Sequence, residues 1–104
     1  MKSILPAKIA KLAERVVAEN IAAGRTIALA ESCTGGLVAS AVTEIPGSSA
    51  VFGSGYVTYS NDAKIKMLGV NEDILDTFGA VSVAVAWAMA QGALKKSGAA
   101  IVVA

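Results

Sequence analysis

Ser32 is the residue of this sequence that is best placed to act as a nucleophile. It lies in the segment Glu31-Ser32-Cys33-Thr34-Gly35-Gly36, between an apolar run and a helical pattern. Ligands of open α/β sheets bind beyond the carboxyl ends of the strands. Backbone N–H groups at a helix N-terminus can hold a phosphate or stabilise an oxyanion. We therefore expect Thr34, Gly35 and Gly36 to offer such donors beside the Ser32 hydroxyl.

A serine nucleophile needs a base, and we expect this base to be a lysine. The sequence contains no histidine, which removes the Ser-His-Asp and Cys-His arrangements within one chain and most transition-metal sites. Burial can lower the pKa of a lysine towards neutrality. Lys64, Lys66 and Lys2 lie near plausible loops, and Lys64 follows the end of the segment that carries Tyr59. If that segment is a strand beside the one before Ser32, Lys64 and Tyr59 can both approach Ser32.

Each of these residues also has a plain structural interpretation. A Ser/Thr-Gly-Gly turn between a strand and a helix is often only a cap, a lysine on a short helix is usually solvated, and Tyr59 can simply pack on its strand. Cys33 shares the helix N-terminus, a position that favours a reactive thiol, but it can equally be an inert small residue. Ser48 and Ser49 follow Pro-Gly and suit an ordinary loop. The turn matches neither the P-loop pattern nor the dinucleotide-binding fingerprint.

Composition narrows the class of protein. The chain has 104 residues, of which 55% are apolar and 16% charged, so we expect one folded domain over residues 1–104 and no disorder. The net charge of +1 comes without a basic run, which gives no support for nucleic-acid binding. No apolar run reaches the roughly 18–20 residues that span a bilayer. Cys33 is the single cysteine, so neither a disulfide nor a zinc cluster is expected, and we expect a cytoplasmic protein without a membrane partner.

Apolar periodicity, caps and glycines predict an alternation of helices and strands. Helices are expected over residues 4–23, 37–45, 63–68, 72–78 and 83–96, and strands over 26–31, 50–60 and 99–104. Asn61 or Asp62 is expected to cap the third helix, and Gly53 and Gly55 are typical of a bulge or a close backbone approach. The alternation predicts an α/β fold, a three-layer α/β/α sandwich with a mixed, largely parallel sheet.

Two features of the C-terminal part bear on completeness and assembly. The helix over residues 83–96 has little polar surface, so we expect it to be covered on more than one side, which favours a homo-oligomer. The apolar strand over residues 99–104 has no following element. Because buried parallel strands are normally followed by a return helix, we expect the chain to be C-terminally incomplete, as part of a longer domain.

Three motifs in order resemble the CinA family, and more narrowly its C-terminal domain. They are Ala30-Glu31-Ser32-Cys33-Thr34-Gly35-Gly36, Ile45-Pro46-Gly47-Ser48-Ser49 and Tyr59-Ser60-Asn61-Asp62-Ala63-Lys64. The match runs from about residue 8 to the end of the chain. Members of the family continue after the strand matching residues 101–104 into a Thr-Gly-x-x-Gly-Pro-Gly-Gly loop that carries further site residues, and this sequence lacks that loop.

The resemblance implies an activity, a mechanism and a set of site residues. The family is associated by name with competence and DNA damage, and its activity is hydrolysis of nicotinamide mononucleotide (NMN) to nicotinate mononucleotide and ammonia, without a metal or an organic cofactor. Ser32 would be the nucleophile, Lys64 its base and Tyr59 a helper in proton transfer or orientation. Substrate contacts would come from Glu31, Cys33, Thr34, Gly35, Gly36, Ser48 and Ser49. The alternative is a non-catalytic nucleotide-binding or regulatory module.

Overall fold

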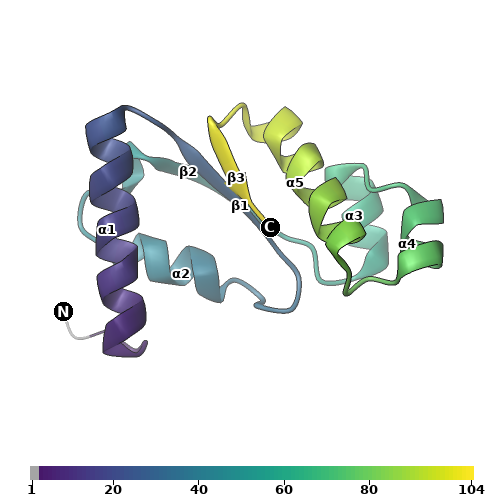
Figure 1. Cartoon of the computed structure of the whole chain (residues 1–104), viewed down its shortest axis with the longest axis horizontal. Helices are drawn as coiled ribbons and strands as arrows, with labels where there is room; N and C mark the ends of the chain where they lie inside the picture. Colours follow the sequence, from purple (N-terminus) through teal and green to yellow (C-terminus); the bar gives the residue numbers. More distant parts are fainter. Residues whose placement is uncertain (1–2) are drawn as a thin grey trace.

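A computed structural model describes residues 3–104 as an α/β fold in three layers. Figure 1 shows a small sheet with α1 and α2 on one face and α3, α4 and α5 on the other. The elements in chain order are α1 (Ala7–Ala23), β1 (Ile27–Glu31), α2 (Leu37–Thr43), the 3₁₀ turn η1 (Ser48–Ala50), β2 (Phe52–Val57), α3 (Asn61–Leu68), α4 (Glu72–Phe78), α5 (Val83–Ser97) and β3 (Ile101–Val103). The predicted three-layer α/β/α arrangement is confirmed.

The sheet has the strand order β2-β1-β3, and both pairings are parallel. Within residues 3–104 the sheet is therefore wholly parallel, with no antiparallel strand of the kind a mixed sheet would contain. The central strand β1 is buried along its whole length, as expected for a parallel strand covered on both faces. Its last residue, Glu31, pairs with Val57, the last residue of β2. The chain segments after β1 and β2 therefore leave the sheet side by side, at its carboxyl edge.

Each face of the sheet carries its own hydrophobic core. On the α1–α2 side, Val17 and Val42 pack with Ile27 and Leu29 of β1. On the α5 side, a second cluster joins the sheet to three helices and includes Ala30, Leu68, Leu75, Val85 and Met89. Burial on both faces fixes the position of β1, and hence the position of the turn that follows it.

Local signals in the sequence explain where the elements begin and end. Gly24 ends α1 in the left-handed conformation that glycine adopts readily, and Asn71 and Ser82 cap α4 and α5 with their side chains. The cap of α3 is Ser60, whose hydroxyl accepts a hydrogen bond from the N–H of Ala63. This corrects the expectation that Asn61 or Asp62 caps α3. The helix begins at Asn61, two residues before the expected start at residue 63.

The bulge predicted in β2 is present. The register of β1 against β2 shifts at Gly53, because Ile27 pairs with Phe52 and Ala28 with Ser54. No helix within residues 3–104 is long and apolar enough to cross a bilayer.

Candidate active site

The turn between β1 and α2 is closed by its own backbone. The N–H of Gly35 donates to the carbonyl of Ser32 over 3.1 Å, and the N–H of Leu37 donates to the carbonyl of Thr34 over 3.0 Å. Gly36 has a φ of 105°, a conformation that side chains strongly disfavour. The turn therefore holds Ser32 at the carboxyl edge of the sheet, directly after the buried end of β1.

The Glu31 side chain occupies the start of α2. Glu31 is 4% exposed, and its carboxylate accepts hydrogen bonds from the N–H groups of Gly36, Val38 and Ala39 at 3.1, 2.9 and 3.0 Å. Burial disfavours the charged carboxylate, but these bonds and one from the Thr34 side chain outweigh it and hold the pKa of Glu31 below its ordinary value. Glu31 is thus an ionised, internally satisfied group.

These bonds decide which donors of the turn remain free. The N–H groups of Gly35 and Gly36 were expected to face a ligand, but both are bonded within the chain, to Ser32 and Glu31. Within residues 3–104 the N–H groups of Cys33 and Thr34 donate to no protein acceptor. Of the three donors predicted for an anion, the structure leaves only that of Thr34 free, and it adds that of Cys33.

Lys64 is a buried amine without a carboxylate partner in the described chain. Its side chain is fully buried, and its Nζ donates to the backbone carbonyls of Thr58 and Tyr59 at 2.8 and 3.0 Å. Burial lowers the pKa of Lys64, while the nearby Cys33 side chain acts in the opposite direction. Lys64 is therefore biased towards the neutral amine, the form a general base requires.

Lys66 differs from Lys64 in every respect that matters for a base. It is mostly exposed and forms an ion pair with Asp62 on the same helix, with Nζ 3.2 Å from Oδ2. Such surface pairs contribute little to the stability of a fold, and the Lys66 side chain lies in solvent, away from the Ser32 turn. Lys2, the remaining candidate, lies outside the described residues.

The topology brings Lys64 and the Ser32 turn to the same edge of the sheet. The N–H of Thr58 donates to the carbonyl of Glu31 over 2.8 Å, and Cys33, the neighbour of Ser32, lies close enough to Lys64 to influence the pKa of the lysine. The predicted adjacency of the two strands is thus present. No hydrogen bond in the described chain joins Ser32 Oγ directly to Lys64 Nζ.

A small pocket opens beside the turn. It measures about 210 Å³ and is lined by Ser32, Cys33 and Thr34 on one side and by residues of the α4–α5 connection and α5, including Ser82 and Met89, on the other. Its wall is mostly apolar with a few hydroxyl groups. Apolar walls with few polar contacts are typical of small-molecule sites.

Tyr59, Ser48 and Ser49 are placed differently from the expectation. The Tyr59 side chain is 73% exposed, and it is the backbone carbonyl of Tyr59 that holds Lys64. Ser49 lines a pocket with Thr26 and Ile27, where β1 begins. At about 3.3 Å per residue, the five residues of β1 separate this edge from Ser32 by about 16 Å. Within one chain, Ser48 and Ser49 do not join the Ser32 site.

Thr58 is a residue of this region that sequence reasoning missed. It is fully buried, it links β1 to Lys64 through its backbone, and its hydroxyl has no hydrogen-bond partner among residues 3–104. The available signal was its position directly after β2, at the same edge as Ser32. That position becomes informative only when the two strands are known to be paired.

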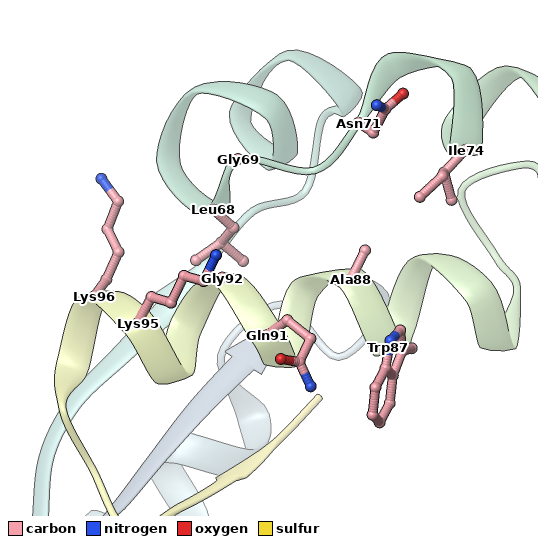
Figure 2. Close-up of a pocket in the computed structure, with 10 residues that line it drawn as sticks. All are labelled: Leu68, Gly69, Asn71, Ile74, Trp87, Ala88, Gln91, Gly92, Lys95 and Lys96. Atoms are coloured by element: carbon pink, nitrogen blue, oxygen red, sulfur yellow. The ribbon is translucent and has the colours of Figure 1, made fainter.

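A second groove lies away from this site (Figure 2). It measures about 430 Å³ and runs between α5 and the end of α3, with Leu68 and Ile74 on one side and Trp87, Gln91 and Lys95 on the other. None of the predicted site residues lines it. No group of three or more His, Cys, Asp or Glu side chains in residues 3–104 could hold a metal ion.

Comparison with known proteins identifies relatives along almost the whole chain. The chain is 56% identical over 89 residues to a CinA-like protein of Chlorobium limicola, an alignment that covers 86% of this chain and 20% of that protein. Among solved structures, the competence/damage inducible protein CihA from Agrobacterium tumefaciens is 53% identical with a TM-score of 0.89, over 91% of this chain and 58% of that one. The competence damage-inducible protein A (ComA) from Klebsiella pneumoniae is 36% identical with a TM-score of 0.89, over 90% and 58%.

These alignments also fix how much of its relatives the chain represents. It spans about a fifth of the length of the curated relative and 58% of the solved Agrobacterium protein. The family model of the CinA C-terminal domain matches residues 9–104, which include the Ser32 turn, Lys64 and all three strands. The chain therefore belongs to the CinA family, through the match of its residues 9–104 to the C-terminal domain.

Proposed function

We propose that the chain carries the nucleophile and the base of an amidohydrolase that converts NMN and water to nicotinate mononucleotide and ammonia. Ser32 is the nucleophile and Lys64 the general base in this proposal. The observation that supports it most is the burial of Lys64 without a carboxylate partner in residues 3–104, at the sheet edge from which Ser32 also projects. An uncompensated buried amine is costly for a fold, and such perturbed groups gather at functional sites.

The hydrogen bonds of Lys64 suit a base. A neutral amine has two N–H donors and one lone pair, and the carbonyls of Thr58 and Tyr59 take two donors. The lone pair then remains free to accept a proton. Tyr59 enters the proposal through this carbonyl, which orients the amine.

The proposed reaction has two stages. Ser32 Oγ attacks the carboxamide carbon of NMN while Lys64 takes the hydroxyl proton, and the free N–H groups of Cys33 and Thr34 stabilise the oxyanion. The carbon–nitrogen bond breaks, the leaving nitrogen takes the proton from Lys64, and ammonia departs. A water molecule then gives its proton to Lys64 and attacks the acyl carbon. The ester bond to Ser32 breaks, the proton returns to Oγ, and nicotinate mononucleotide leaves.

Ammonia release from NMN tests this function, with substitutions matched in position. Ser32→Ala is expected to reduce turnover by on the order of 10³-fold or more, and Lys64→Ala by about 10²- to 10⁴-fold. The matched controls are Ser40→Ala, on the exposed surface of α2, and Lys66→Ala, on the same helix as Lys64. Both controls are expected to retain activity.

A longer relative gives the assay an internal reference. Because the chain spans 58% of the solved Agrobacterium tumefaciens protein, that protein and its equivalent variants are assayed in parallel. Mass spectrometry of the protein mixed with NMN is expected to detect an acyl group on Ser32. Turnover that survives Ser32→Ala in both proteins would refute the assignment of the nucleophile.

A second candidate is a nucleotide-binding module without turnover. The observation in its favour is that no hydrogen bond joins Ser32 Oγ to Lys64 Nζ in the described chain, although such bonds are often long before substrate binds. Calorimetry separates the two functions. Tight NMN binding without ammonia release, unchanged by Lys64→Ala, would favour the module over the enzyme.

A further inference from the structure

The start of α2 already holds an anion, and this anion is the Glu31 side chain. Its two carboxylate oxygens take the N–H groups of Gly36, Val38 and Ala39 at 2.9–3.1 Å. Those are the donors that a helix N-terminus would otherwise present to a ligand. A bound phosphate or carboxylate cannot use them while Glu31 does. Glu31 is only 4% exposed, and although the residue borders the pocket beside the turn, its carboxylate is engaged by these three N–H groups.

The backbone of Glu31 connects the same residue to Lys64. The Glu31 carbonyl accepts from the N–H of Thr58 at 2.8 Å. The Thr58 carbonyl in turn accepts from Lys64 Nζ at 2.8 Å. Two consecutive hydrogen bonds, through Thr58, therefore connect Glu31 to Lys64. Ser32 directly follows Glu31 in the chain. No other residue described in the chain contacts both the Ser32 turn and the support of Lys64 in this way.

We propose that Glu31 is a positioning residue for the Ser32–Lys64 pair, and not the substrate contact that its place in the motif implies. Its carboxylate closes the turn from Ser32 to Gly36 and fixes the direction in which Ser32 Oγ leaves the sheet. Its carbonyl fixes Thr58, which orients Lys64. The catalytic part of this inference rests on the proposed function, whereas the closing of the turn does not.

Glu31→Gln is the substitution that tests the proposal. Glutamine keeps the shape of the side chain but replaces one acceptor oxygen by an N–H₂ group, which faces backbone donors and cannot accept from them. Misplacement of a reacting group by about 1 Å can cost about 100-fold in rate. We therefore expect kcat for NMN to fall about 10- to 100-fold while KM stays within about twofold. Glu31→Asp, which keeps the charge, is expected to recover part of kcat.

Amide hydrogen exchange gives a readout that needs no turnover. In the unsubstituted protein the N–H groups of Gly36, Val38 and Ala39 are expected to exchange slowly. Glu31→Gln should accelerate exchange by about tenfold or more at those of the three that lose their acceptor oxygen. The matched control is Glu44→Gln, at the other end of α2, where the carboxylate accepts from Ser3 Oγ over 2.6 Å. It should leave kcat, KM and those three amides unchanged.

The outcomes separate this proposal from the proposed function. A rise in KM with kcat unchanged in Glu31→Gln would make Glu31 a substrate contact and overturn the proposal. Unchanged exchange at the three amides in Glu31→Gln would overturn it as well. If Glu31→Gln folds poorly, Glu31→Asp decides instead, because a kcat that does not rise above that of Glu31→Gln although the carboxylate is restored would also overturn the proposal. If neither this protein nor the Agrobacterium relative releases ammonia, the proposed function fails, and exchange alone then decides whether Glu31 closes the turn.

Discussion

The burial of Lys64 predicts how the rate of the proposed reaction depends on pH. Only the neutral amine can accept the Ser32 proton, so kcat/KM should rise with pH as Lys64 loses its own proton. Burial lowers the pKa of Lys64 below its ordinary value of 10.5, so the midpoint of the rise is expected below pH 10.5. The measurement is the rate of ammonia release from NMN across pH, and a midpoint at or above 10.5 would contradict the assignment.

A matched pair of variants isolates this effect. Arginine stays charged at all accessible pH values, so Lys64→Arg should abolish both the activity and its rise with pH. Lys66→Arg keeps a solvated charge on the same helix and should leave the profile unchanged. Loss of the rise in Lys66→Arg would show that the base was assigned to the wrong lysine.

The ionised Glu31 side chain makes the stability of the fold depend on pH in the acid range. Its folded-state pKa lies below the ordinary value of 4.5, so its bonds to α2 stabilise the fold fully above about pH 4.5. That stabilisation is lost as the pH falls through the lower folded-state pKa. Urea unfolding between pH 3 and 6, a range chosen around this value, should therefore show less acid sensitivity in Glu31→Gln than in the unsubstituted protein. Equal acid sensitivity of the two would contradict the depressed pKa.

Among the helices, α5 can contact α3 closely because residue 92 is a glycine. A Cβ at Gly92 would overlap the backbone carbonyl of Leu68, and backbone cannot give way as a flexible side chain can. Helix propensity alone would make Gly92→Ala stabilising by about 1 kcal/mol. We expect the overlap to dominate and the free energy of unfolding to fall by about 1–3 kcal/mol, as in other overpacked sites.

Gly53 provides the control for this prediction. A Cβ there meets nothing within 4 Å, and its φ is not in the left-handed region. Gly53→Ala should therefore change the free energy of unfolding, measured by urea denaturation, by less than about 0.5 kcal/mol. If Gly92→Ala is as stable as the unsubstituted protein, α5 must be able to move away from α3 at little cost.

The elements were largely predictable from the sequence because their signals are local. Gly24, Asn71 and Ser82 mark helix ends through bonds that reach only a few residues along the chain. Gly53 marks the bulge in the same way. The assignment of the cap of α3 failed by a single residue, because Ser60, Asn61 and Asp62 are all good caps and only the backbone geometry selects Ser60.

The internal arrangement of the site was less predictable because its hydrogen bonds join residues that are further apart along the sequence. The carboxylate of Glu31 reaches five to eight residues ahead, so the motif alone did not reveal that it takes the donors of α2. Ser48 and Ser49 follow the crossover helix α2 and precede the parallel strand β2. A parallel crossover returns the chain to the amino edge of the sheet, which is why these serines lie far from Ser32.

At the scale of the whole molecule, α5 has one buried face and one exposed face. Val85, Met89 and Ala93 point into the core, whereas Val83 and Trp87 are 87% and 66% exposed. α5 packs against the sheet and also against α3 and α4, so the expectation that this helix is covered on more than one side is met, while the side that carries Val83 and Trp87 stays open within residues 3–104. An exposed tryptophan beside other exposed apolar residues is typical of a surface that another protein surface covers.

This exposed face leads to a prediction about assembly. We expect the protein to form a homo-oligomer in which Trp87 and Val83 are buried, because a buried tryptophan is a common anchor of interfaces. A stable interface around them would cover about 800 Å² on each partner. Sedimentation velocity should show a dimer or larger species, which Trp87→Glu converts to a monomer. Leu12→Glu, a change at a residue of α1 that is 47% exposed, should leave the assembly intact. A protein that sediments as a monomer at tens of micromolar would contradict self-association, and dissociation by Leu12→Glu alone would place the interface on α1.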